Sequence, residues 1–134
     1  MLEFKTLLAF AKDLVNCMVY FYKDSWNAPP GNVKSPFLHI MGEAIIRFTL
    51  YYREWLNSVA EEVISRVDEE PEEFFEFGYE LADQLFQNEP FMELIAICSF
   101  ITYIAHILFI MGKRQFMDKA YFMIAILFLK LRNR

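Results

Sequence analysis

The segment 94–111, LIAICSFITYIAHILFIM, contains no Asp, Glu, Lys or Arg. A helix that is apolar on every side either spans a membrane or forms the buried centre of a helical domain. This run is barely long enough to span, since a typical bilayer needs about twenty residues. Amphipathic helical patterns precede and follow it, and each has an apolar face that needs a surface to pack on. We therefore predict that 94–111 is a core helix, buried by the rest of the chain.

Helix-breaking residues are rare in this chain. Four glycines and five prolines in 134 residues leave little room for tight hairpins, and apolar residues recur at helical spacing. The hydrophobic content is 56%, against roughly 45–50% in an ordinary soluble domain, so there is ample material for one core. The sequence predicts a single all-α domain over residues 1–134, in which amphipathic helices surround the central apolar one.

Capping signals predict where the helices begin and end. The first helix should cover about 2–22. Ser35 followed by Pro36 is typical of a helix start. The helical pattern from there to about residue 65 is long for one helix, which predicts a bend at 57–60. Further helices are predicted from about Pro71 to 86, from Pro90 to a glycine stop at Gly112, and from 113 to the end of the chain.

The sequence carries no signature of catalysis or of metal binding. His39 and His106 lie far apart, and there is no metal-binding pair, G-x-S-x-G motif or phosphate-binding glycine loop. The acidic run 68–73 lacks the alternating ligands and the turn glycine of a calcium-binding loop. We predict no enzymatic activity, no cofactor and no metal, and we interpret His106 as a hydrogen-bonded core residue.

The charge balance and the two cysteines indicate which partners the protein is suited to and in which cellular compartment we expect it. The 18 acidic residues outnumber the 13 basic ones, giving a net charge of −5, and no basic stripe suited to nucleic acid is present. Charged residues interrupt the N-terminal apolar pattern, so we predict no secretory signal. Cys17 and Cys98 each lie in an apolar helical pattern without metal-like spacing, which predicts buried, reduced thiols and a cytoplasmic location.

Three segments carry a family resemblance. The stretch AIIRFTLYYREWL at 44–56 has the spacing Ala-x-x-x-Phe-x-Leu-x-Tyr-Arg of the second helix of pro-survival Bcl-2 proteins. The stretch ELADQLFQNEPFMELIAICSF at 80–100 resembles the Bcl-2 homology 1 region with a loop one residue shorter, and 12–26 is similar to the family's first helix. The matching positions are Leu14, Val15, Trp26, Ala44, Phe48, Leu50, Tyr52, Arg53, Leu85, Phe86, Ala96, Ser99 and Phe100.

The resemblance implies a fold and an activity. Bcl-2 proteins are all-α domains with a buried apolar central helix, and pro-survival members bind the BH3 helix of pro-apoptotic relatives in a surface groove. Sequestering those helices blocks cell death. A short chain without a C-terminal membrane anchor is most similar to virus-encoded members, which implies a location in the host cytoplasm, peripheral to mitochondria. The implied BH3 groove consists of Phe48, Tyr52, Leu56, Val59, Leu81, Leu85, Phe91, Glu93, Ala96 and Phe100.

The chain departs from the family pattern at several positions. Ile45 and Ile46 replace the Gly-Asp pair of the BH3 signature, so we do not expect this chain to act as a BH3 donor. Glu93 replaces an arginine that in the family pairs with an aspartate of the ligand, and losing such a partly buried pair costs about 2–5 kcal/mol. We therefore expect narrow partner selection, unless Arg47 supplies the cation. The Bcl-2 homology 2 motif is missing.

Three further possibilities follow from the same residues. An empty apolar groove is an exposed patch, which predicts a homodimer formed through or beside it. A Bcl-2-fold signalling adaptor that has lost BH3 binding is compatible with Glu93. A conditional membrane-inserting hairpin could be built from 94–111 and 120–129, but the second run is short for a bilayer. Under the leading interpretation, membrane association is not required.

Overall fold

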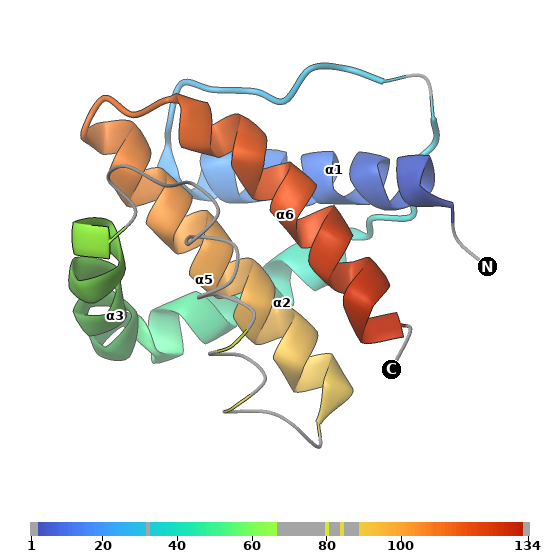
Figure 1. Ribbon diagram of the computed structural model, residues 1–134. Coiled ribbons are helices and arrows are strands. Elements are labelled where there is room, and N and C mark those ends of the chain that lie inside the picture. Colours follow the sequence, from blue (N-terminus) through green and yellow to red (C-terminus); the bar gives the residue numbers. More distant parts are fainter. Residues whose placement is uncertain (1–2, 32, 67–79, 81–83, 85–88, 133–134) are drawn as a thin grey trace.

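The computed structural model describes residues 3–31, 33–66, 80, 84 and 89–132 (Figure 1). These residues form helices and loops and contain no β-strand, which confirms the all-α prediction. The helices are α1 (Phe4–Tyr22), α2 (His39–Tyr51), α3 (Arg53–Arg66), α5 (Pro90–Ile110) and α6 (Gln115–Arg132). Of the helix predicted from Pro71 to 86, the structure describes residues 80 and 84 alone, both helical. Leu81 and Leu85 of that prediction lie outside the described residues.

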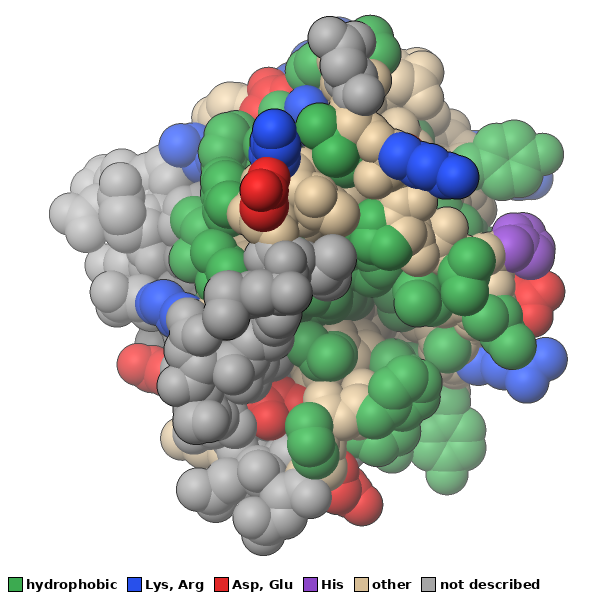
Figure 2. Space-filling model, turned by 90° about the vertical axis from the view of Figure 1, so that its right-hand side faces the viewer, with side chains coloured by type: hydrophobic (Ala, Val, Ile, Leu, Met, Phe, Trp, Pro, Cys, Tyr) green, Lys and Arg blue, Asp and Glu red, His purple; other side chains and the backbone are tan. Residues whose placement is uncertain are grey.

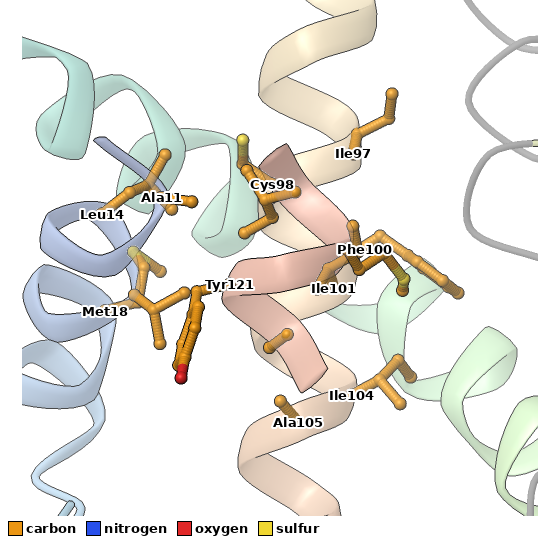
Figure 3. Packing of buried hydrophobic residues seen from close by; sticks show 14 of the residues in the cluster. Ala11, Leu14, Met18, Ile97, Cys98, Phe100, Ile101, Ile104, Ala105 and Tyr121 are labelled. Atoms are coloured by element: carbon orange, nitrogen blue, oxygen red, sulfur yellow. The ribbon is translucent and has the colours of Figure 1, made fainter. Parts of the chain in front are cut away.

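Helix α5 lies at the centre of the bundle and contacts α1, α2, α3 and α6 (Figure 1). Every residue from 96 to 105 is buried, which confirms the predicted core helix. In Figure 3, Cys98 of this helix points toward Leu14 of α1, whereas Ile97 points away from it. The helix is apolar all round because it has neighbours all round, and burying each large aliphatic side chain contributes about 1.5–3 kcal/mol.

Helix α5 is also the one described helix that is long and apolar enough to cross a membrane. Of its most apolar 18-residue window, 67% is buried inside the protein. The core helix of a soluble domain passes the same length and composition test, so this property by itself is weak support for a membrane span.

The ends of α5 follow the predicted capping signals. Glu89 occupies the N-cap position and Pro90 the first turn, where a missing N–H is tolerated. After Ile110 the chain reaches Gly112, which has φ +90°, a conformation that favours glycine. Its N–H donates to the carbonyl of Phe109, so the predicted glycine stop is confirmed.

The second helical region differs from the prediction in two places. Ser35 and Pro36 do not start a helix, because the Ser35 hydroxyl accepts a hydrogen bond from the N–H of Phe37, 3.1 Å away, which makes a local turn. The helix begins three residues later than Pro36. The bend predicted at 57–60 lies at Tyr52, with φ −102° and ψ 24°, and separates α2 from α3. This change of direction brings the fully buried Leu56 and the rest of α3 against α5.

Helices α1 and α2 approach each other closely at Gly42. A Cβ atom at this position would lie 2.6 Å from Cys17 Sγ and 3.3 Å from Phe37 Cζ. Because real Cβ atoms do not approach other atoms so closely, only glycine fits this crossing without movement of a neighbour.

Candidate functional site

An apolar pocket of about 360 Å³ lies between α1, α2, α5 and α6. Its lining side chains come from these four helices and from the loop before α2, and none carries a charge or a hydrogen-bonding group stronger than a thiol. They are Leu7, Phe10, Leu14, Pro36, Met41, Ala44, Ile45, Phe91, Leu94, Ile95, Cys98 and Phe128. Figure 2 shows apolar side chains gathered around a hollow on this side of the molecule.

Helical periodicity explains how these residues meet. On α1, Leu7, Phe10 and Leu14 follow the i, i+3, i+7 spacing that puts side chains on one face. The Phe10 ring makes an edge contact with Phe37 at 5.8 Å between centroids and a tilted contact with Phe128 at 5.3 Å. These ring contacts join α1 to α6 and to the loop before α2, and they fix one side of the pocket.

The pocket is open at one end and closed at the other. At the mouth, Phe91 is 70% exposed and Met41 is 37% exposed. At the inner end, Leu14 and Cys98 are only 1% and 2% exposed. The opening therefore leads from solvent down to the core helix α5.

The thiol of Cys98 is the most polar group in the pocket. Burial raises the pKa of Cys98 well above its usual range, because the thiolate would lose its hydration. A neutral thiol is a poor nucleophile, so Cys98 acts here as a small apolar wall. Both cysteines are free, as predicted, although Cys17 is only half-buried.

The predicted groove residues take up three kinds of position. Four of them belong to the buried interior, two on the α2–α3 segment and two on α5. They are Phe48, Leu56, Ala96 and Phe100. Tyr52 and Val59 are half-buried, and Phe91 is largely exposed. The structure brings Phe48 and Tyr52 together as their i, i+4 spacing predicts, with ring centroids 4.5 Å apart.

Glu93 occupies a different environment from the one the sequence suggested. Its side chain is fully buried, at 0% exposure, and it makes an interaction within the protein. A clash between Glu93 and an acidic ligand requires a carboxylate on the surface, so this conformation does not present that clash. Arg47, the suggested substitute cation, is exposed on α2.

A polar cluster that sequence reasoning missed lies across the bundle from this pocket. His106 Nδ1 is 2.7 Å from Asp24 Oδ2, and the His106 ring stacks on Tyr22 at 4.2 Å. This confirms His106 as a hydrogen-bonded residue, although it is half-buried. Nearby, the hydroxyls of Thr49 and Ser99 are 2.6 Å apart. The partners were invisible in sequence because Asp24 and His106 are 82 positions apart.

The part of the chain that the structure describes holds no cluster of three or more His, Cys, Asp or Glu side chains suited to a metal ion. The described site is therefore one of shape and apolar contact, and its twelve lining residues include no candidate acid, base or activated nucleophile. The chain matches no protein-family model, no curated protein and no solved structure.

Proposed function

We propose that this chain is a Bcl-2-like, virus-encoded inhibitor of host-cell apoptosis that sequesters the BH3 helices of pro-apoptotic proteins. The observation that carries this proposal is the central helix α5, which is buried over its whole middle and contacted by four other helices. That arrangement is the one the sequence resemblance implies. The order of the resembling motifs supports it further. The matched residues of α1, α2 and α5 follow one another along this chain in the same order as in the family.

The partly exposed members of the predicted groove on the α2–α3 segment are positions where a partner helix can make first contact. Tyr52 and Val59 are half-buried on the α2–α3 segment, whereas Phe48 and Leu56 beside them are buried. Contact with the buried members requires their neighbours to move, as in complexes that rearrange on binding. We therefore expect Tyr52 to be an anchor residue of the complex, in line with the frequency of tyrosine among interface hot spots.

The test is a titration of a panel of fluorescently labelled BH3 peptides with the purified chain, read by fluorescence polarisation. The variant Tyr52→Ala removes a ring that contacts Phe48 and Trp55. Its matched control is Tyr20→Ala, because Tyr20 lies on α1, outside the predicted groove, and is 87% exposed. We expect submicromolar binding to one or a few peptides, with Tyr52→Ala weakening it at least about tenfold, or about 1.4 kcal/mol, and Tyr20→Ala leaving it nearly unchanged.

Circular dichroism of each variant shows whether the fold is kept. If no peptide binds the folded wild-type chain, the sequestration mechanism is wrong. A folded Tyr52→Ala variant that binds as tightly as the wild type would place the binding site away from the predicted groove.

A second candidate function has its own supporting observation. The burial of Phe48, Leu56 and Phe100 leaves these predicted anchors inaccessible in the described conformation. A signalling adaptor with this fold, without BH3 binding, is compatible with that burial. A chain that fails to bind BH3 peptides while still suppressing a host signalling response in cells would favour the adaptor.

A further inference from the structure

We propose that the apolar pocket between α1, α2, α5 and α6 binds one unbranched alkyl chain of a monomeric amphiphile. The helix-binding positions Tyr52 and Val59 do not line this pocket. Phe91 at the mouth is the one described residue that this pocket shares with the predicted BH3 groove. Because the expected anchor Tyr52 lies outside the pocket, each proposal can fail without the other.

The chemistry of the walls selects an apolar occupant. Two other hollows of similar size on this protein are partly polar. One, of about 420 Å³ beneath the loop after α1, is lined by Lys5, Lys12 and Asp13 among others, and one of about 340 Å³ includes Arg53 and His106. None of the described residues that line the apolar pocket carries such a group. A charged or hydrogen-bonding ligand would lose its water there without replacement, whereas a hydrocarbon gains by leaving water.

The size of the pocket fits a small apolar ligand. Its volume of about 360 Å³ lies within the range of about 300–1,000 Å³ that is typical of small-molecule sites. Phe91 and Cys98 are both on α5 and both line the pocket, and seven residues of helix span about 10 Å. A hydrocarbon chain can lie along this stretch of α5.

The closed inner end explains why the ligand is an amphiphile with one chain. A tail that enters past Phe91 and Met41 reaches Leu14 and Cys98, where the pocket meets the core. The chain cannot pass through, so its polar head stays at the mouth in water. The exposed side chains of Phe91 and Met41 at the mouth then cover the first carbons of the tail.

The experiment titrates straight-chain primary alcohols, from butanol to decanol, into methyl-labelled protein and follows the methyl signals by NMR. Signals of Met41 and Ile45, which line the pocket, should shift and saturate. Those of Ile104, which is buried elsewhere on α5, should not. Each added methylene should tighten binding about fourfold, which is about 0.8 kcal/mol, until the chain fills the pocket. No saturable shift, an equal response at Ile104, or affinity independent of chain length would overturn the proposal.

A pair of matched variants tests the location. Ala44→Phe places a ring in the pocket from α2, and Ala9→Phe makes the same change at a half-buried alanine of α1 that lines the polar hollow instead. We expect Ala44→Phe to weaken decanol binding at least tenfold and Ala9→Phe to preserve it. If Ala44→Phe does not fold, Phe91→Ala at the exposed mouth replaces it, with a smaller loss expected. Unchanged affinity in a folded pocket variant rules out this site.

Two further experiments distinguish a monomeric alkyl ligand from lipid in a bilayer and from a BH3 helix. Flotation with phosphatidylcholine vesicles tests whether lipid in a bilayer is the occupant. Binding to vesicles without binding to monomeric octanol would overturn the proposal. A BH3 peptide that displaces octanol would make the pocket part of a helix-binding site and would also overturn it. Octanol binding by a chain that binds no BH3 peptide would leave this pocket assigned and the sequestration function rejected.

Discussion

The close crossing of α1 and α2 makes Gly42→Ala an informative substitution. The added Cβ would lie 2.6 Å from Cys17 Sγ, whereas non-bonded heavy atoms prefer about 3.5–4.0 Å. The helices or the Cys17 side chain must therefore move by about 1 Å. Met41 and Ala44, on either side of Gly42 in the sequence, both line the apolar pocket, so the same movement should also widen it.

The expected magnitude is a balance of two effects. Overpacking a well-packed contact costs about 1–3 kcal/mol. Alanine is favoured over glycine inside a helix by about 1 kcal/mol. We expect Gly42→Ala alone to lower the free energy of unfolding by about 1 kcal/mol. In a Cys17→Ala background the sulfur is gone and the tightest remaining contact is Phe37 Cζ at 3.3 Å. In that background the helix propensity of alanine should exceed the remaining packing cost. Gly42→Ala should then raise the free energy of unfolding.

A double-mutant cycle measures this difference. Urea denaturation of the wild type, both single variants and the double variant, followed by far-UV circular dichroism, gives the four free energies of unfolding. The coupling between positions 17 and 42 should be about 1–2 kcal/mol. If the two changes add within about 0.5 kcal/mol, the sulfur does not limit the helix crossing and the reasoning from this contact is wrong.

Three other predictions concern the thiols, the polar cluster and the membrane. The raised pKa of both Cys17 and Cys98 keeps them protonated in the folded state while unfolded thiols ionise above about pH 8.5. The unfolded state then binds fewer protons, so the free energy of unfolding should fall with rising pH between about 8.5 and 10. Denaturation measured at several pH values tests this, and a variant without cysteines should lose most of the pH dependence. Asp24→Asn replaces a carboxylate bonded to His106 at 2.7 Å, and should lower the free energy of unfolding by about 1–3 kcal/mol, whereas Asp13→Asn, at an exposed site, should change it by less than about 0.5 kcal/mol. Phosphatidylcholine vesicles loaded with a self-quenched dye should not leak on addition of the folded protein, and leakage at neutral pH would favour the membrane-inserting hairpin.

Sequence patterns predicted most of the helical architecture. The uncharged run 94–111 indicated the core helix, and Pro90 and Gly112 marked its ends, because each of these signals is local. The bend was misplaced, at 57–60 instead of Tyr52, because it depends on how α3 reaches α5. Helical hydrogen bonds continue through the bend, with the Leu56 N–H donating to the Tyr52 carbonyl, so no breaker residue marks it.

The site was harder to predict than the fold. The i, i+4 spacing of Phe48 and Tyr52 predicted that their side chains meet, and the structure places their rings in contact. The same spacing cannot separate a groove wall from a core position, since both are apolar at i and i+4. Of the predicted groove residues that the structure describes, Phe91 alone lines the apolar pocket. The hollow itself results from the separation of four helices, which no single segment encodes.

The arrangement of the helices also bears on the membrane-inserting alternative. Helix α1 alone buries seven apolar residues, and its neighbours include both α5 and α6. At about 1.5–3 kcal/mol for each large side chain, that face contributes on the order of 10 kcal/mol. The whole stability of a domain is about 5–15 kcal/mol. Removing α5 and α6 into lipid would expose this face to water and would therefore amount to unfolding the bundle. In water, four neighbouring helices pack against the apolar surface of 94–111. The apolarity that makes this segment resemble a membrane span is therefore the property that lets it form the core of the bundle.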